Sequence, residues 1–288
     1  MKKALLPLIA VVCVCAALSQ QPPAAVSPSN RGGGAGGASG GRGPGRVQPD
    51  PVDFNDHPGW QQLFDGTTLT GWDGNSDVWK VVDGVIAGEF NTPAGTRNGQ
   101  TFLIWKGGEV ADYELKLEIK MEGITADSGI QYRAYLLAPG QGRGAAAAPA
   151  PAGPLTSQSV QWNLGGYQFD FNYPGNYDGQ EAEAGPGARG IIAYRGQVVR
   201  AEEGKRPRLV GTLGTMESLG GCYRHNDWNQ VHLIARGNTF THLINGHVMS
   251  IFIDEDPTKF KPKGLIGLQC AGSGTVQISF RNIWLRRM

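Results

Sequence analysis

The sequence predicts an all-β fold, a sandwich of two antiparallel sheets. Residues 78–82 and 85–88 are two β-rich runs joined by Asp83-Gly84, a pair that accepts the positive φ angles of a type I′ hairpin turn. Residues 113–121 alternate apolar and charged side chains without a break, as a strand does when one face is buried and the other is wet. No segment of the globular part carries a sustained helical period, so sheets are expected throughout.

Shorter apolar runs separated by turn residues continue this pattern to the end of the chain. We expect strands at 130–135, 160–162, 167–171, 191–194, 198–200, 231–236, 239–244, 248–253, 265–270 and 276–285. Arg195-Gly196-Gln197 is the expected turn between the fourth and fifth of these runs. Asn245-Gly246 is a second type I′ signal and predicts another hairpin.

The first 19 residues have the three parts of a secretory signal peptide: two lysines, an apolar run over 4–18 and small residues at its end. The run is shorter than the roughly 20 residues that a membrane-spanning helix needs. We therefore expect a secreted or periplasmic protein. A lipid anchor on Cys13 or Cys15 is less favoured, because a valine precedes each cysteine where a small residue is wanted.

Composition divides the rest of the chain. Residues 20–51 are rich in Gly, Pro, Ala and Ser, which cannot bury enough apolar surface to offset the entropy of ordering, and are expected to form a disordered linker. Residues 52–288 have a globular composition that suits one β-sandwich domain. Within that domain, the Gly, Ala and Pro of residues 138–158 indicate a low-complexity loop inserted between two strands.

Charge and cysteine content narrow the partners. The chain has 26 basic and 25 acidic residues, a formal net charge of +1. This balance gives no electrostatic reason to expect nucleic acid or an anionic membrane, and favours a neutral small molecule or polymer. Cys222 and Cys270 remain after the signal peptide; a disulfide between them and two buried thiols are both open.

Several segments, in order, resemble one known family, the 3-keto-disaccharide hydrolase domain. The segments are Gly59–Trp72, Trp79–Ile86, Asp112–Leu115, Ser128–Arg133, Gly166–Asp170, Asn226–Gln230, Leu243–Gly246 and Phe280–Ile283. Together they cover the chain from about Pro58 to its C-terminus. Their order and number, rather than any single motif, make the resemblance specific.

The resemblance implies a concanavalin A-like jelly roll and action on glycosides whose sugar carries a ketone at carbon 3. A ketone there acidifies the proton on carbon 2. Removing that proton gives an enolate, which can expel the group at carbon 1, and water added to the resulting enone completes a net hydrolysis. This route needs a base near carbon 2, an acid near the leaving oxygen and positive charge near the enolate oxygen. Direct displacement needs two flanking carboxylates instead.

The strand predicted at 167–171 supplies the first candidates. Period two places Tyr167, Phe169 and Phe171 on one face and Gln168 and Asp170 on the other. A carboxylate and an amide that project together suit a polar sugar site, although an ordinary wet strand face gives the same pattern. Much of the family has Glu in place of Gln168, so we assign catalysis to Asp170 and substrate binding to Gln168.

Three further residues are candidates for substrate binding. Arg133, which ends a family segment, and Arg189, which follows an acidic loop in the family, can bind a ketone or enolate oxygen. A salt bridge at the sheet rim is the alternative for Arg133. Trp162 can stack on a sugar ring, although tryptophans are also used in jelly-roll cores.

Two further residues are candidates for catalysis. Glu181 lies in the expected acidic loop 177–183 and can act as an acid or base, with a solvated loop as the alternative. His242 shares a predicted strand face with Phe240 and Ile244, which makes a satisfied core histidine the alternative to a catalytic one.

The sequence predicts no metal site, because it has no His-x-His, His-Glu-x-x-His or calcium-loop spacing. Spacing alone does not address a divalent cation held by distant strands, so the cofactor is unknown. No Rossmann glycine fingerprint occurs, so a separate oxidoreductase is expected to make the ketone. The alternative to a 3-keto-glycoside hydrolase is a non-catalytic, lectin-like carbohydrate-binding module.

Overall fold

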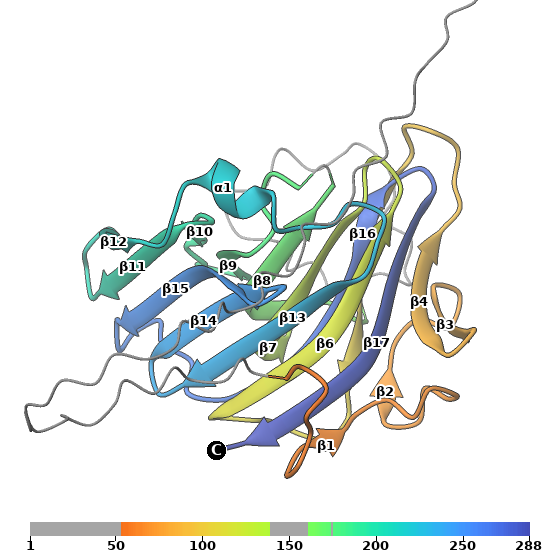
Figure 1. The fold of residues 1–288 in the computed structure, drawn as a ribbon, viewed down its shortest axis with the longest axis horizontal. Coiled ribbons are helices and arrows are strands. Elements are labelled where there is room, and N and C mark those ends of the chain that lie inside the picture. The colour runs from red at the N-terminus through yellow and green to blue at the C-terminus, as the bar shows by residue number, and fades with distance from the viewer. Residues whose placement is uncertain (1–52, 139–160, 174) are drawn as a thin grey trace, which may run out of the picture. The chain divides into compact units, whose positions relative to one another are not determined.

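The computed structural model describes residues 53–138, 161–173 and 175–288, and this part of the chain forms two packed β-sheets (Figure 1). The predicted signal peptide and linker lie outside the described residues. So does the predicted loop insert at 138–158, apart from Ala138. Among the described residues, no helix is long and apolar enough to cross a membrane.

The larger sheet has ten strands. Its order is β12 (Arg208–Thr212), β11 (Gln197–Glu202), β15 (His247–Glu255), β14 (Thr239–Ile244), β13 (Asn229–Arg236), β6 (Tyr113–Glu122), β17 (Val276–Arg287), β4 (Val85–Phe90) and β3 (Trp79–Val82), with β1 (Gln61–Gln62) beside β17. One five-residue helix, α1 (Met216–Gly220), follows β12. Thr215 caps that helix by accepting the backbone N–H of Ser218.

The second sheet has seven strands. Its order is β10 (Gly190–Ala193), β9 (Gln180–Ala184), β8 (Leu164–Asn172), β7 (Asp127–Leu136), β16 (Leu265–Ser273), β5 (Arg97–Trp105) and β2 (Trp72–Asp73). The strand pairs of both sheets are antiparallel except for β11 with β15, which run parallel. The prediction of an all-β sandwich of two antiparallel sheets is confirmed.

Both predicted type I′ turns are present. Asp83 and Gly84, between β3 and β4, have φ angles of 50° and 79°, and Asn245 and Gly246, between β14 and β15, have φ angles of 50° and 80°. Aspartate, asparagine and glycine tolerate this left-handed backbone, which matches the twist of the flanking strands. The two turns therefore fix the register of their hairpins.

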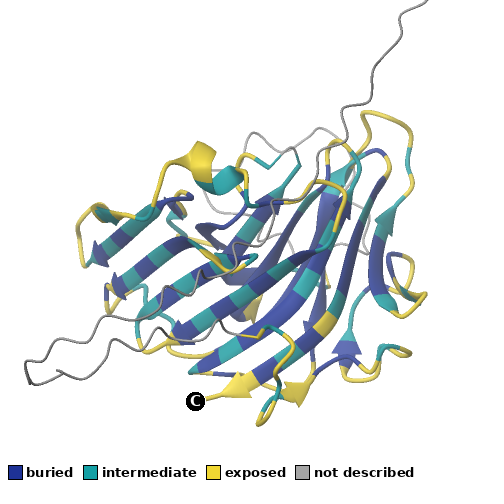
Figure 2. Ribbon diagram, viewed as in Figure 1, coloured by how far each residue is buried: buried dark blue, intermediate teal, exposed yellow. Residues whose placement is uncertain are grey.

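The core lies between the sheets and follows the alternation of the strands. Burial alternates residue by residue along β13 and β14, seen as dark and light bands in Figure 2. On β6 the residues Tyr113, Leu115, Leu117 and Ile119 are all fully buried. Lys116 departs from this pattern because its Nζ atom lies 4.7 Å from the ring of Trp60, which covers its stem on the other face.

One local expectation was wrong. Residues 161–162 form a turn rather than a strand, and residue 160 lies outside the described part. The turn expected at Arg195-Gly196-Gln197 is present, with the N–H of Gln197 donating to the carbonyl of Tyr194 at 3.0 Å. It carries the chain from one sheet to the other, because β10 pairs with β9 in the seven-stranded sheet whereas β11 pairs with β12 and β15 in the ten-stranded one.

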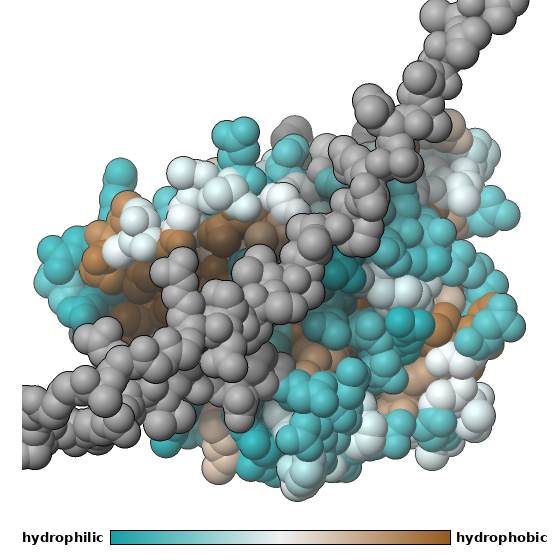
Figure 3. Space-filling model, viewed as in Figure 1, coloured by the Kyte–Doolittle hydropathy of each residue, from teal (hydrophilic) through white to brown (hydrophobic). Residues whose placement is uncertain are grey.

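Apolar side chains are exposed at the end of the sandwich formed by β12 and α1 (Figure 3). Leu209, Val210 and Met216 are 55%, 48% and 43% exposed. The side chains over β6 and β17 on the same view are largely hydrophilic.

Candidate functional site

Asp170 lies on the outer face of the seven-stranded sheet. On β8 the rings of Tyr167, Phe169 and Phe171 belong to the core between the sheets, so Asp170 and Gln168 project to the opposite face, as the alternation predicts. Asp170 is partly exposed and Gln168 is buried. The carboxyl group of Asp170 is therefore outside the packed interior.

Two glutamines hold the carboxyl group of Asp170. The Nε2 atom of Gln168 donates to Oδ1 at 3.0 Å, and the Nε2 atom of Gln180, on the neighbouring strand β9, donates to Oδ2 at 2.7 Å. The pairing of Asp170 with Gln180 across β8 and β9 places the second donor. An ionised carboxylate only accepts hydrogen bonds, so two amide donors fix its orientation.

A row of amide side chains continues from this carboxylate across the sheet. The Nε2 atom of Gln168 also donates to Oε1 of Gln269 on β16, at 2.8 Å. Gln269 donates to Oε1 of Gln100 on β5 at 3.0 Å, and Gln100 donates to Oδ1 of Asn163 at 2.9 Å. We call Gln168, Gln269, Gln100 and Asn163 the amide row.

A glycine on β7 makes room for the amide row. Strand β7 lies between β8 and β16, so the side chain of Gln168 must pass over it to reach Gln269. Gly129 pairs with Asp170 at this position, and a Cβ atom on Gly129 would lie 2.4 Å from Nε2 of Gln168. The absence of a side chain at Gly129 therefore permits the contact between β8 and β16.

Trp162 stands beside this face, at the β5 side. It is partly buried and packs against a small apolar cluster formed by Phe102, Ile104, Ala134 and Leu164. Its Nε1 atom donates to Oδ1 of Asp73 at 3.1 Å, which fixes the plane of the indole. A fixed, partly exposed ring beside the amide row is suited to stacking on a sugar. The binding role of Trp162 stays a prediction.

Glu181 and His242 lie together on the inner side of the sheet. Glu181 pairs with Phe169 across β8 and β9 and thus faces the core. Its Oε2 atom lies 3.1 Å from Nε2 of His242 and accepts the hydroxyl of Tyr132. The imidazole of His242 stacks on the ring of Phe169, with centroids 3.9 Å apart.

Burial dominates the electrostatics of this inner pair. Glu181 and His242 are each 1% exposed. Burial raises the pKa of Glu181 above its ordinary value, and the contacts with His242 and Tyr132 offset part of that rise. Among the described residues, the Oε1 atom of Glu181 has no hydrogen-bond partner. The segment expected as an acidic loop is in fact largely strand β9, and the satisfied core histidine is the arrangement observed for His242.

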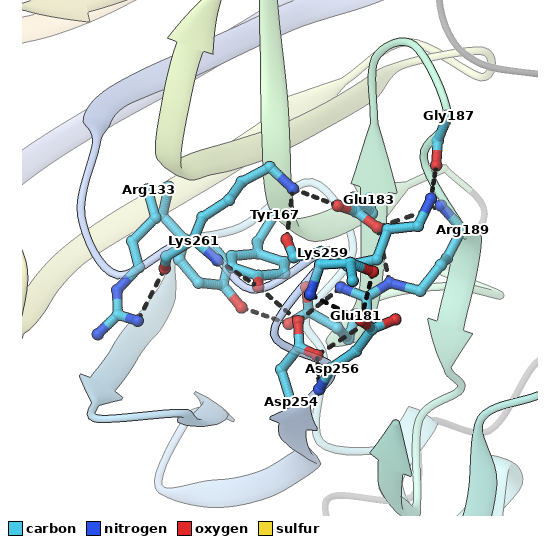
Figure 4. Close-up of polar contacts among 12 residues, drawn as sticks. Arg133, Tyr167, Glu181, Glu183, Gly187, Arg189, Asp254, Asp256, Lys259 and Lys261 are labelled. Atoms are coloured by element: carbon cyan, nitrogen blue, oxygen red, sulfur yellow. Dashed lines mark hydrogen bonds and ion pairs between the residues drawn. The ribbon is translucent and has the colours of Figure 1, made fainter. Parts of the chain in front are cut away.

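Arg189 is committed to an ion-pair network at the end of β9 (Figure 4). Its guanidinium group donates to both carboxylate oxygens of Asp254, at 2.9 and 2.6 Å, and to Oε2 of Glu183 at 2.8 Å. The hydroxyl of Tyr167 also donates to Asp254, and Nζ of Lys261 pairs with Glu183. The Nε, Nη1 and Nη2 atoms of Arg189 thus all donate to carboxylate oxygens of the protein, which gives this guanidinium group a structural role.

Arg133 is buried against the core by a β-bulge. Its φ angle is 41°, and the register of β7 with β8 shifts between Tyr132 and Tyr135. As a result Tyr132 and Arg133, although adjacent, both contact the ring of Phe240. The guanidinium of Arg133 donates to three backbone carbonyls, those of residues 111, 237 and 261, and pairs with Asp112 at 3.0 Å.

The structure thus divides the predicted site residues into two groups. Asp170 and Gln168 share the outer face, and Trp162 borders it. Glu181, His242, Arg133 and Arg189 have their partners on the inner side of the sheet or at its edge. Sequence reasoning missed Gln180, Gln269 and Gln100; the alternation of Gln180 with Glu181 was a usable signal for the first, whereas the other two depend on strand order.

Asp178, in the connection between β8 and β9, is a buried carboxyl group outside both sets. Its Oδ1 atom accepts the backbone N–H of Asn172 at 3.0 Å, and Oδ2 has no hydrogen-bond partner within the part of the chain that the structure describes. Burial raises the pKa of Asp178 to about 7, although the N–H of Asn172 and the charge of Arg195 act in the opposite direction.

The described residues form neither a cluster of metal ligands nor a disulfide. Among residues 53–138, 161–173 and 175–288, no group of three or more His, Cys, Asp or Glu side chains is placed to hold a metal ion. Cys222 and Cys270 are both free thiols, which decides between the two alternatives left open by the sequence.

The two packed, predominantly antiparallel sheets define the class of this protein as a β jelly roll. The chain matches the model of the 3-keto-alpha-glucoside-1,2-lyase-like domain over residues 59–286 and belongs to that family. The resemblance read from the sequence segments is confirmed. No curated protein matches the chain.

Solved structures with a similar fold share little sequence with this chain. A protein of unknown function with a galectin-like fold from Bacillus subtilis is 10% identical, with a TM-score of 0.47 over 79% of this chain and 94% of that one. Carbohydrate-binding module CBM66 from Bacillus subtilis is 11% identical, with a TM-score of 0.44 over 77% and 98%. A Bacillus licheniformis β-glucanase is 10% identical, with a TM-score of 0.43 over 81% and 100%.

Proposed function

We propose that this protein cleaves 3-keto-glycosides, including 3-keto-disaccharides, by removing the proton from carbon 2 of the keto sugar. The observation that carries the proposal is the placement of Asp170, a partly exposed carboxylate on the outer sheet face whose two oxygens are held by Gln168 and Gln180. Membership of a family named for a 3-keto-glucoside 1,2-lyase supports an elimination across carbons 1 and 2.

In the proposed reaction Asp170 is the base. Its carboxylate takes the carbon 2 proton, and the electron pair of that C–H bond forms the enolate with the carbon 3 ketone. The enolate then expels the oxygen at carbon 1, which leaves with a proton as the free alcohol and gives an enone. Water adds its hydroxyl to carbon 1 and a proton to carbon 2, so the net change is hydrolysis.

The proposal gives structural roles to the residues with partners on the inner side or edge of the sheet. Glu181 and His242 are separated from Asp170 by the sheet, and their polar atoms contact each other and Tyr132. Arg133 and Arg189 already bind carbonyl and carboxylate oxygens. Both guanidinium groups are therefore assigned to the fold rather than to the enolate oxygen.

The proposal also includes the setting of the reaction. The chain is exported through its N-terminal signal, and a separate oxidoreductase supplies the keto sugar. Cell fractionation of the expressed full-length chain tests the first point: we expect the protein outside the cytoplasm and shortened near residue 19. A full-length protein that stays in the cytoplasm contradicts it.

The experiment that tests the function compares a 3-keto-disaccharide with the same disaccharide unoxidised. We expect release of monosaccharide from the keto substrate alone. In Asp170→Asn turnover falls about 100- to 10,000-fold, the usual contribution of a general base, while substrate binding is largely kept. Asp77→Asn, which alters an exposed carboxylate elsewhere, is the matched control. Turnover of the unoxidised substrate alone contradicts keto specificity.

A carbohydrate-binding module without catalysis is the second candidate. The observation that favours it is Trp162, whose ring is fixed by Asp73 beside the polar face. This function predicts that Trp162→Ala abolishes retention on an immobilised glycan and that no product appears from any substrate. The Asp170→Asn comparison separates the two, because only an enzyme loses turnover and keeps binding.

A further inference from the structure

The amide row has a single direction. Each member donates its N–H to the oxygen of the next, from Gln168 to Gln269, from Gln269 to Gln100 and from Gln100 to Asn163. Three consecutive bonds of 2.8 to 3.0 Å with one polarity leave each amide one orientation that satisfies its neighbours. The row therefore behaves as one unit rather than as separate surface amides.

The carboxylate of Asp170 sets that direction. A carboxylate accepts and does not donate, so Gln168 must turn its NH2 group toward it. The amide of Gln168 has two N–H bonds; one is used on Asp170 at 3.0 Å and the other on Gln269 at 2.8 Å. Because both N–H bonds of Gln168 have acceptors, the plane of its amide group is fixed. The direction of its hydrogen bond to Asp170 is therefore fixed as well.

Burial excludes direct substrate contact for the first two members of the row. Gln168 is 3% exposed and Gln269 is 0% exposed. Water cannot easily replace a bond lost there, so a change at Gln269 must be absorbed by movement of Gln168. The backbone of Gln269 is also held in place, because its carbonyl oxygen accepts the hydroxyl of Ser128 on β7 at 2.8 Å.

We propose that Gln269, on the second strand from β8, is a positioning residue for Asp170 that acts through Gln168 across the gap at Gly129. Gln100 extends the same support by fixing the amide of Gln269. The part of this inference that concerns the cleavage reaction rests on the proposed function. The part that concerns the orientation of the Asp170 carboxylate can be tested without measuring turnover.

The test uses the full-length protein and Gln269→Met, which keeps the length of the side chain and removes its acceptor and donor. Gln277→Met is the matched control, because Gln277 bonds to Ser279 on a strand of the other sheet. The first readout is NMR at one pH. The side-chain NH2 signal of Gln168 is assigned by its loss in Gln168→Met, and the ¹³Cγ signal of Asp170 by its loss in Asp170→Asn.

We expect both signals to move in Gln269→Met and neither to move in Gln277→Met. If Gln269→Met does not fold, Gln269→Glu replaces it. The glutamate keeps an acceptor for Gln168, so we expect the Gln168 signal to stay and the bond to Gln100 to be the one disturbed. An Asp170 signal unchanged in Gln269→Met, or a Gln168 signal lost in a folded Gln269→Glu, overturns the inference whether or not the protein has activity.

The second readout is a double-mutant cycle on kcat with the 3-keto-disaccharide. We expect Gln269→Met to lower kcat about tenfold with KM nearly unchanged, because the base is misaligned and the remaining substrate contacts are kept. Because Gln269 acts through Gln168, the double variant should be no slower than Gln168→Met alone. If the fold losses in kcat of the two single variants multiply in the double variant, the inference is overturned. Full activity of Asp170→Asn overturns the proposed function instead, and leaves the NMR result to judge how Asp170 is held.

Discussion

The Nε2 atom of His242 lies 3.1 Å from Oε2 of Glu181, and both side chains are closed off between the two sheets. These are two of the three residues that the sequence suggested for catalysis. They lie on the inner side of β9 and β14, where one oxygen of Glu181 pairs with one nitrogen of His242. The third, Asp170, projects from the other face of the same sheet as Glu181.

Removing Glu181 should therefore cost stability rather than chemistry. Glu181→Leu leaves His242 and the hydroxyl of Tyr132 without their buried acceptor, and we expect a loss of about 3–5 kcal/mol in the free energy of unfolding. Urea titration followed by tryptophan fluorescence measures it, and kcat of the remaining folded protein should stay within a few-fold of wild type. Glu203→Leu, at an exposed site, is the control. A stable but inactive Glu181→Leu protein contradicts the assignment.

Arg189 gives a second test of whether the residues with partners on the inner side or edge of the sheet have structural rather than catalytic or binding roles. Its removal in Arg189→Met leaves the carboxylates of Glu183 and Asp254, 2% and 0% exposed, without their shared cation. We expect a loss of about 3–5 kcal/mol in unfolding free energy, with KM for the keto substrate within about threefold. Arg206→Met, at an exposed position, should be neutral. A large rise in KM with unchanged stability instead places Arg189 at the substrate.

Asp178 predicts a pH dependence of stability. Its pKa is about 7 in the folded protein against an ordinary value of 3.8, so between about pH 4 and pH 7 the folded state keeps a proton that the unfolded state has released. The free energy of unfolding therefore falls as pH rises through this window, by at most about 4 kcal/mol from this group.

Asp178→Asn removes that contribution. The stability of the variant relative to wild type should rise steadily from pH 4 to pH 7 and level off above, as measured by urea titration at each pH. Comparing the two proteins cancels the other titrating groups. Parallel curves over the whole range contradict the raised pKa.

Gly129 provides a test of the gap under the amide row. In Gly129→Ala the new Cβ atom would lie 2.4 Å from Nε2 of Gln168, which must leave its bonds with Asp170 and Gln269. We expect kcat to fall by about tenfold or more. Gly211→Ala is the matched control in a strand, because a Cβ there meets its nearest atom at 3.6 Å. Equal activity of the two variants shows that the amide of Gln168 does not support the reaction.

Much of the fold could be predicted from the sequence because its signals are local. Asp83-Gly84 and Asn245-Gly246 need a left-handed backbone, and a hairpin supplies it. Residues 167–171 alternate in a strand, so Gln168 and Asp170 had to share a face whatever the strand order. These inferences depend on neighbours in the chain and held without knowledge of the topology.

The rest of the site depends on contacts that the sequence does not encode locally. Gln269 and Gln100 lie 169 residues apart, and only the pairing of β16 with β5 joins them. The bulge at Arg133 breaks period two, and two distant glycines pack against it: a Cβ at Gly166 would lie 2.8 Å from the Cα atom of Ala134, and one at Gly264 would lie 2.2 Å from the carbonyl carbon of Arg133. The burial of Glu181 could be predicted only if residues 180–184 were recognised as strand β9 rather than as part of an acidic loop.

The central claim, that Asp170 takes a proton from carbon 2, is tested most directly by running the reaction in D2O. The account predicts that 3-keto sugar released by the wild-type protein carries deuterium at carbon 2, in excess of an enzyme-free control with the same sugar, and that Asp170→Asn loses both release and labelling. Release of a product with hydrogen still at carbon 2 contradicts proton abstraction and requires direct displacement at carbon 1.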